Sequence, residues 1–246
     1  MPATLASKRY TVDDAARAME FCFDKGWTDG LPVVPPTEPA VRAMLDAARL
    51  APDTKLTYIR DRFVTVTAEK VAINAVMAGC KPEYMPVVAA AVEGIGDERW
   101  GYHGPGTSTG GAAVLMIVNG PIARELDINA GDNLFGPGWR ANLAIGRAVR
   151  LVMRNVCGSM PGLLDRGTVG HPGKLSYVIA ENEAESPWTP LHVERGFRPE
   201  QSTVTVMAAE GPHQFYNQLS SNAEGVLTTL ADNMRISGNV MGQPHY

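Results

Sequence analysis

The segment from Gly101 to Gly111 constrains the fold of this chain more than any other, because it is too rich in glycine and proline for a regular helix. It reads Gly-Tyr-His-Gly-Pro-Gly-Thr-Ser-Thr-Gly-Gly and leads directly into the apolar run 112–118. In a helix interior, glycine costs about 1 kcal/mol and proline about 3 kcal/mol relative to alanine. We therefore expect a loop whose backbone N–H groups and hydroxyls line a polar pocket, followed by a strand buried on both faces.

The order of this loop and strand excludes one familiar class of site. In nucleotide-binding motifs a strand leads through glycines into a helix, whereas here the glycines come before the strand. We interpret the loop instead as a nest for an oxyanion or carboxylate, with His103 as acid, base or ligand and with Thr107, Ser108 and Thr109 as substrate-binding residues. The alternative is a tight connection whose hydroxyls satisfy their own backbone.

Apolar periodicity predicts the other elements. The expected helices cover about 14–26, 37–50, 67–79, 82–95, 140–156 and 221–234. The expected strands cover about 63–66, 112–118, 175–180 and 203–208. Strands separated by helices indicate an α/β fold, with a mixed or parallel sheet flanked by helices in a single compact domain. We expect an N-terminal helical and extended arm over 1–50 and an α/β core over 51–246.

Composition narrows the functional classes. The net charge of −4 argues against a dedicated nucleic-acid-binding protein, which is usually basic. No apolar stretch approaches the roughly 18 residues of a membrane span, and the first ten residues lack an apolar signal core. Three scattered cysteines do not form a disulfide framework. We therefore expect a cytoplasmic protein that contacts neither nucleic acid nor membrane.

The start of the predicted helix 140–156 is a second candidate site. It follows the turn Gly136-Pro137-Gly138, and free N–H groups at a helix start favour anions. The candidate substrate-binding residues here are Gly136, Trp139, Arg140 and Asn142. Trp139 could stack on a planar substrate and Arg140 could hold a carboxylate.

The same helix carries arginines on one face. Arg147, like Arg140, lies near the turn and could also serve the site, whereas we interpret Arg150 and Arg154 as a solvated basic face.

Acids and histidines follow the predicted strand 175–180. Carboxylates at the end of a strand, followed by a histidine, are typical of an acid/base pair or a metal site, although a solvated surface is the alternative. The candidate catalytic residues are His103, Glu183, His192 and Glu194. In a variant of this hypothesis, a divalent metal ion is held by some of the four residues His103, His171, His192 and Glu194.

The thiols are weaker candidates. Cys157 closes the predicted helix 140–156, where the negative end of the helix dipole raises the pKa of a thiol. No second cysteine follows within three residues, so no resolving partner is at hand. The sequence does not decide whether Cys80 or Cys157 is reactive.

The segment Asp29-Gly30-Leu31-Pro32-Val33-Val34-Pro35-Pro36-Thr37-Glu38 resembles a poorly characterised bacterial family with a DGLP-x-x-PPTE opening, related to selenoproteins with a Sec-Gly-Ser-Cys motif. The segments 69–86, 135–142 and 175–188 are also similar to longer members. Cys157-Gly158-Ser159-Met160 is similar to that motif, but methionine stands where the resolving cysteine would be. The resemblance implies a reductase-type activity, and the longer relatives imply a partner subunit.

From these residues we expect a subunit of a small-molecule enzyme with lyase-like or hydrolase-like acid–base chemistry, metal-assisted in one variant, on a small anionic or carbonyl substrate. One alternative is reductive cleavage of a carbon–heteroatom bond with a thiol or selenol partner. Another is a non-catalytic subunit of a hetero-oligomeric enzyme. A second protein chain, identical or different, is expected in each case.

Overall fold

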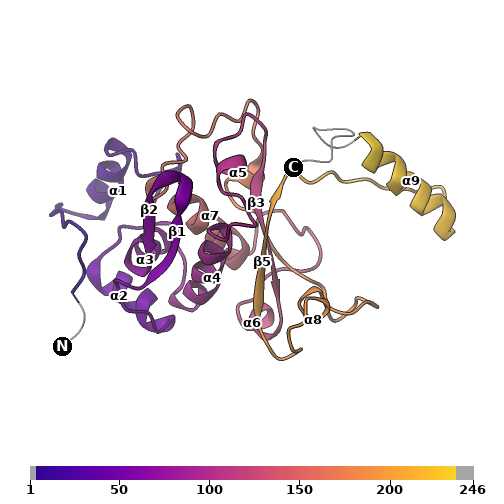
Figure 1. Cartoon of the computed structure of the whole chain (residues 1–246), viewed down its shortest axis with the longest axis horizontal. Helices are drawn as coiled ribbons and strands as arrows, with labels where there is room; N and C mark the ends of the chain where they lie inside the picture. Colours follow the sequence, from indigo (N-terminus) through magenta and orange to yellow (C-terminus); the bar gives the residue numbers. More distant parts are fainter. Residues whose placement is uncertain (1–3, 237–246) are drawn as a thin grey trace.

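Three helices with broad apolar faces form the centre of the molecule. In the computed structural model, which describes residues 4–236, these are α3 (Ala68–Met77), α4 (Met85–Ile95) and α7 (Arg140–Asn155) (Figure 1). Each helix contacts the other two, and α4 also contacts strand β5 of the central sheet. The arrangement confirms a mixed α/β fold.

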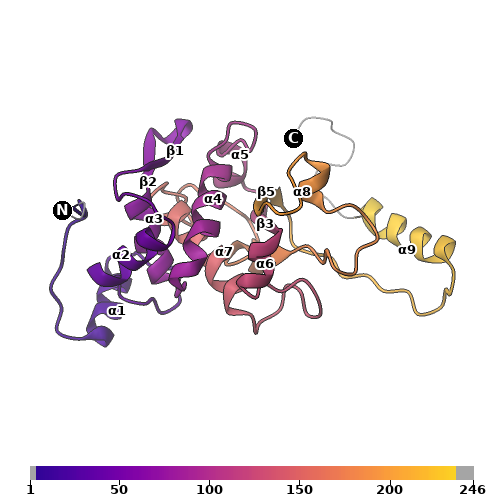
Figure 2. The ribbon, with the colours of Figure 1, turned by 90° about the horizontal axis from the view of Figure 1, so that it is seen from below.

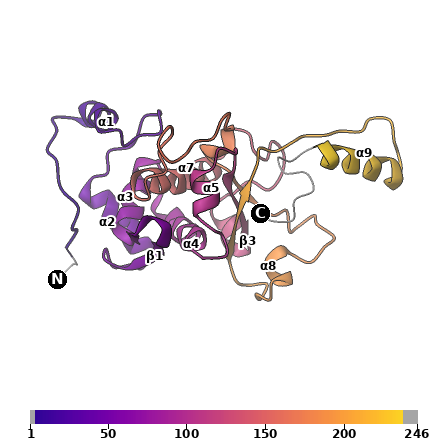
Figure 3. The ribbon, with the colours of Figure 1, turned by 45° about the horizontal axis from the view of Figure 1, so that its top comes forward.

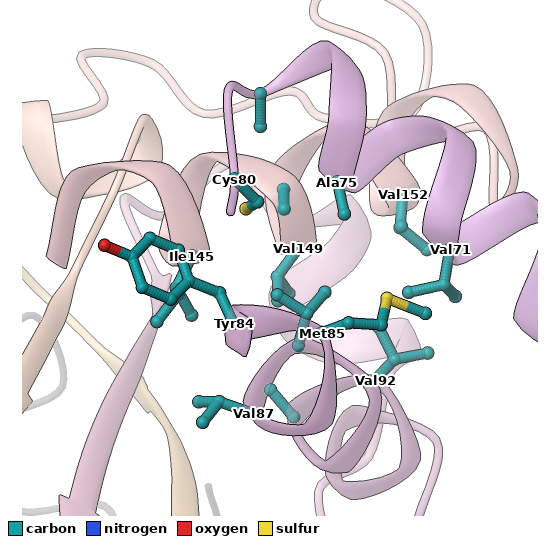
Figure 4. Packing of buried hydrophobic residues seen from close by; sticks show 14 of the residues in the cluster. Val71, Ala75, Cys80, Tyr84, Met85, Val87, Val92, Ile145, Val149 and Val152 are labelled. Carbon is teal, nitrogen blue, oxygen red and sulfur yellow. The ribbon is translucent and has the colours of Figure 1, made fainter. Parts of the chain in front are cut away.

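Small and branched side chains fill the space between these helices. Val71 of α3, Met85 and Val92 of α4, and Val149 and Val152 of α7 meet in one buried cluster (Figure 4). All five are at most 2% exposed. Burying a side chain of this size stabilises the fold by roughly 1.5–3 kcal/mol, so the cluster accounts for much of the cohesion of the three helices.

The central sheet has three strands in the order β4-β3-β5. Strand β3 (Ala113–Asn119) runs parallel to β4 (Val178–Ala180) and antiparallel to β5 (Thr203–Ala209). Of the two predicted possibilities, a mixed or a parallel sheet, the sheet is mixed. Met116 and Val118 point into the core, whereas Leu115 and Ile117 on the other face are only partly buried. The expectation that both faces of β3 are covered is therefore not met by the described residues.

A second, smaller sheet pairs β1 (Lys55–Ile59) with β2 (Val64–Thr67) in antiparallel register. The predicted strand 63–66 corresponds to β2. Strand β1 was not predicted, because it lacks a continuous apolar run. The predicted strand 175–180 is shorter than expected, since Leu175 closes the 3₁₀ turn η3 and only 178–180 pair with β3.

Two further helices, α1 (Ala15–Asp24) and α2 (Glu38–Ala47), lie at the N-terminal side (Figure 1). Val41, Met44 and Leu45 of α2 belong to the same buried cluster as α3 and α4. Short helices complete the chain: η1 (Arg60–Arg62), η2 (Pro82–Tyr84), α5 (His103–Thr107), α6 (Pro121–Glu125), η3 (Pro172–Lys174) and α8 (Leu191–Glu194).

Helix α5 corrects the prediction that no residue of the glycine-rich segment is helical. It is little more than one turn, with Pro105 at its third position. There the missing N–H of proline costs no hydrogen bond, because the first N–H groups of a helix have no partner within it. Glycine and proline disfavour a long helix in this segment, but they do not exclude a single turn.

Arginines of α7 hold the extended DGLP segment in place. The Arg147 guanidinium donates to both carboxylate oxygens of Asp29, at 2.7 and 2.8 Å, and to the carbonyls of Leu31 and Pro32. Arg154 donates to the carbonyl of Gly26. The basic face of α7 is thus a structural clamp, which corrects both the solvated interpretation of Arg154 and the substrate interpretation of Arg147.

Arg150 likewise corrects the sequence interpretation. It forms a buried ion pair with Asp165, whose other oxygen accepts from Lys174 Nζ at 2.7 Å. The side chains of all three are at most 16% exposed. This triad ties α7 to the loop before β4.

Helix α9 (Ala223–Ile236) projects away from the rest of the molecule, at the yellow end of the ribbon (Figures 1, 2 and 3). None of its side chains up to Arg235 is buried. Over residues 4–236, no helix is both long enough and apolar enough to span a membrane.

We predict that Asp29→Asn destabilises the protein by about 3 kcal/mol at pH 7, because it leaves the largely buried Arg147 without its counter-charge. Burial alone would raise the pKa of Asp29, but the hydrogen bond and charge of Arg147 outweigh it and hold the pKa below its ordinary value. The stabilisation is therefore complete above about pH 4 and is lost as the pH falls further. Urea unfolding from pH 7 to pH 3 measures both effects.

Glu200→Gln is the matched control, since it breaks the exposed pair with Arg198. It should change stability little at any pH. The clamp would be contradicted if wild type and Asp29→Asn had the same free energy of unfolding at pH 7. It would also be contradicted if the difference between them grew as the pH falls.

Candidate functional site

The carboxyl ends of the parallel strands β3 and β4 meet at one edge of the sheet and carry a group of polar side chains. Strand β3 ends at Asn119, and β4 is followed directly by Glu181 and Glu183. His192 of α8 lies against them. We call these four residues the carboxylate cluster. In open α/β sheets, this edge is where ligands usually bind.

Hydrogen bonds fix the two carboxylates. The buried Asn119 donates from Nδ2 to Glu181 Oε2 and to Glu183 Oε1, at 2.5 and 2.8 Å. The Gly120 N–H also donates to Glu183 Oε1, and the Leu191 N–H donates to Glu181 Oε2, each at 2.8 Å. Glu183 therefore lies at the start of α6 and Glu181 at the start of α8, where N–H groups are free to receive a carboxylate.

His192 is only 2% exposed and lies beside Glu183, with Nδ1 at 3.7 Å from Glu183 Oε1. Its Nε2 is 3.4 Å from the carbonyl oxygen of Pro199. Nδ1 makes no hydrogen bond with any described residue, and the same holds for the buried Asn119 Oδ1 and Thr203 Oγ1. Asn119 and Thr203 are direct partners across β3 and β5. Leaving such atoms unpaired costs roughly 1–3 kcal/mol each, and their concentration at one edge indicates a functional constraint.

Glu194 does not join this cluster. It lies two residues after His192 on α8, and a two-residue step on a helix turns the side chain by about 200°. The two residues would share a face only in an extended segment. Glu194 is exposed, while His192 is buried. Of the two candidate glutamates, Glu183 lies beside His192 and Glu194 does not.

The glycine-rich segment lies at the opposite end of β3, because it enters the strand that the carboxylate cluster leaves. At about 3.3 Å per residue, the seven-residue strand separates the two by about 20 Å. His103 and His192, both candidate catalytic residues from the sequence, therefore do not converge on one pocket among the described residues. His103 is exposed on α5.

The hydroxyls of this segment bond to nearby backbone. Thr107 Oγ1 donates to the carbonyl of His103, and Ser108 Oγ accepts from the N–H of Gly110. The carbonyl of Thr109 accepts from both the N–H and the hydroxyl of Thr168. These contacts fit the alternative interpretation, a tight connection that satisfies its own backbone.

The four residues expected at the start of α7 have different roles. Gly136 closes a turn on Asn133. Asn142 is buried and bonds to the backbone of Asn129 and Val178, so it joins α7 to β4 and does not face a ligand. Trp139 and Arg140 do line a cavity, one of about 310 Å³ that lies between α7, η2 and the end of α6.

The residues of the metal variant are not brought together. His171 packs its ring against Tyr177 and accepts from the N–H of Gly173, and His103 lies beyond the far end of β3. Over residues 4–236, no group of three or more His, Cys, Asp and Glu side chains is placed to hold a metal ion.

Another cavity was not expected from the sequence. It has a volume of about 580 Å³ and lies between the N-terminal segment, α1, α2 and α3. Tyr10, Phe21 and Trp27 form an aromatic group on its wall, with ring centroids 5.1–5.9 Å apart. The two carboxylate oxygens of Glu69 accept hydrogen bonds from the N–H groups of Ala6 and Ser7. No periodic pattern in the sequence connects these positions.

The comparisons with known proteins found no match, so the resemblance to the DGLP family stays a prediction. No protein-family model, no curated protein and no solved structure matches this chain.

The three cysteines are buried free thiols. Burial raises the pKa of Cys80 to about 12 and that of Cys157 to about 11, although a hydrogen bond from Tyr102 partly offsets the rise at Cys157. The direction predicted for Cys157 is confirmed, but its main cause is burial and not the helix dipole.

We predict that thiol reagents label the native protein slowly. Because the thiolate is the reactive form, Cys80 and Cys157 should react about 100-fold or more slowly at pH 8 in the native state than in denaturant. Colorimetric thiol titration with and without guanidinium measures the difference. Rapid labelling of the native protein at either position, identified by mass spectrometry of the labelled peptide, would overturn this expectation.

Proposed function

We propose that the chain is a subunit of a small-molecule enzyme that uses Glu183 and His192 for proton transfer. The supporting observation is the carboxylate cluster, in which a buried histidine nitrogen without a hydrogen bond lies 3.7 Å from a carboxylate oxygen. Glutamate and histidine are common general acids and bases, and a positioned pair contributes typically 10²–10⁴-fold to a rate.

In this proposal each member of the cluster has a separate task. Asn119 and the N–H of Gly120 hold Glu183 through Oε1, which is also the oxygen near His192 and can stabilise its protonated form. The second oxygen of Glu183 is left to approach a substrate. The unpaired Asn119 Oδ1 and Thr203 Oγ1 offer hydrogen bonds to a polar substrate group. A small anionic or carbonyl-bearing compound fits this chemistry, in a lyase-like or hydrolase-like reaction that begins with proton abstraction.

Proton abstraction can be tested before the full reaction is known. In D₂O, the wild-type protein should exchange an α-proton of at least one compound in a panel of small oxo, hydroxy and amino acids, followed by proton NMR. Glu183→Gln and His192→Asn should each slow that exchange by about 100-fold, because each removes a proton-transfer group. Glu194→Gln, on the exposed side of α8, should leave it unchanged.

Failure of the wild-type protein to exchange any compound in the panel would count against catalysis by this chain alone. Exchange that persists in both Glu183→Gln and His192→Asn would remove the proposed roles.

The alternatives are supported less well by the described residues. A reductase with its thiol in this chain would need a reactive cysteine, whereas all three are buried with raised pKa values. Free thiols do fit the reducing cytoplasm, where we propose that the protein resides. A divalent metal remains a variant of the acid–base proposal, with its ligands unassigned.

Association with a second chain has a specific observation in its favour. Helix α9 carries Val226, Leu227 and Met234, at 41%, 60% and 66% exposure, and it projects away from its own domain (Figure 2). An isolated helix of 14 residues is marginal in water, so an apolar face of this kind normally packs against another surface. We propose that this chain works as a subunit of an oligomer, either with copies of itself or with a different chain.

We predict that the double variant Leu227→Asp, Met234→Asp weakens this association. Light scattering after size exclusion should give a larger mass for the wild-type protein, with its partner gene product if one is needed, than for the variant. Glu224→Lys with Arg235→Glu, which changes charge at exposed positions of the same helix, is the control. Equal masses for wild type and variant, with or without a partner, would exclude a role for α9 in assembly.

A further inference from the structure

The 310 Å³ cavity at the start of α7 has features of a ligand site that the proposed catalytic cluster does not use. It lies between the N-terminus of α7, the 3₁₀ turn η2 and the residues that follow α6. Its volume is at the lower end of the roughly 300–1,000 Å³ typical of small-molecule sites, so a compact ligand would fill it. Its lining includes Lys81, Glu83, Tyr84, Asp127, Trp139 and Arg140.

The N-terminus of α7 provides donors at one wall. This helix is 16 residues long, and its N-cap residue Trp139 makes no side-chain capping bond. The first N–H groups of an uncapped helix lack partners, and the helix dipole places about half a positive charge there. A carboxylate is the natural ligand for such an end.

Tyr84 provides a second, independent donor to the same cavity. Its side chain is 4% exposed, and its hydroxyl makes no hydrogen bond with any described residue. The ring packs among apolar side chains while the hydroxyl points away from them (Figure 4). Burial raises the pKa of this phenol, so it remains a proton donor at neutral pH. Because Tyr84 lines the cavity and its hydroxyl has no partner among the described residues, this hydroxyl is free to donate to a ligand there.

Charges of both signs surround the cavity. Lys81 and Arg140 are cationic, and Glu83, Glu125 and Asp127 are anionic. None of the five takes part in an ion pair with a described residue, although Arg140 also donates to the carbonyl of Gly79. The acids are not grouped in a way that would hold a metal ion. A ligand with a single charge would match only half of this wall.

We propose that the cavity binds a small zwitterion, a molecule of amino-acid type that carries one carboxylate and one ammonium group. Its carboxylate lies against the N-terminus of α7, within reach of Arg140 and the Tyr84 hydroxyl. Its ammonium group lies toward Asp127 and Glu125, and Trp139 contacts its apolar part. The proposal concerns binding, and it stands whether or not Glu183 and His192 catalyse a reaction.

Ligand-observed NMR with the purified full-length protein tests the ligand class. The probes are the twenty common amino acids together with β-alanine and γ-aminobutyrate. The tightest binder is then compared with two relatives of the same carbon skeleton, the amine without its carboxylate and the acid without its amino group. Each should bind at least about tenfold more weakly, since each loses a charge-assisted contact.

Two variants test the site. Tyr84→Phe removes the hydroxyl but keeps the packing of the ring, and Asp127→Asn removes one charge on an exposed side chain. Each should weaken binding of the best zwitterion by about tenfold. The matched controls are Tyr58→Phe on β1 and Asp61→Asn on η1, which should bind as the wild type does. Thermal unfolding verifies that the variants fold.

Glu183→Gln separates this proposal from the proposed catalysis, because it should lose proton exchange but retain binding. The zwitterion site is overturned if no probe binds with a Kd below about 10 mM. It is also overturned if the amine or the acid binds as tightly as the zwitterion, or if both Tyr84→Phe and Asp127→Asn bind normally.

Discussion

Helix α7 is the element on which the rest of the structure depends, because its two sides do different work. Its apolar side contributes Val149 and Val152 to the core, and its polar side holds backbone segments far away in sequence. The pair between Arg147 and Asp29 is the firmest of these contacts, since both side chains are largely buried and the geometry is bidentate. Desolvating the two charges costs free energy, which is recovered only when Asp29 lies directly against Arg147. The ion pair therefore fixes the position of the DGLP segment along α7.

Strand β3 then decides how the polar segments of the chain are distributed. Helix α7 packs on one face of the sheet, and the polar connections collect at the two ends of β3. The glycine-rich segment enters one end and bonds largely to itself. The other end carries Asn119, the two glutamates and His192. Helix α6 starts at this end, and the residues at its other end line the cavity together with Trp139 and Arg140, so this short helix connects the two polar sites.

These two sites share one physical property: each contains hydrogen-bonding or charged groups that have no partner among the described residues. At the carboxylate cluster it consists of a histidine nitrogen, an amide oxygen and a threonine hydroxyl. At the cavity it consists of a buried phenol, a helix terminus and unpaired charges of both signs. Elsewhere, buried polar groups such as Asn142 and Asp165 are matched by partners. Buried polar atoms without a partner also occur at Arg62, Trp100, Arg154 and His171, whereas three of them gather at the carboxylate cluster. Because unused donors and acceptors cost stability, this gathering points to function.

The sequence by itself determined many of the elements, because local forces decide them: apolar periodicity predicted α3, α4 and α7 closely, and an unbroken apolar run predicted β3. It also identified Glu183, His192, Trp139 and Arg140 as candidates from their residue types. Tertiary structure decided which of these meet. The direction of β3 separates His103 from His192, helical geometry separates His192 from Glu194, and the arginines of α7 reach backbone more than 100 residues away. Such long-range pairings depend on how whole elements pack, which no local pattern encodes.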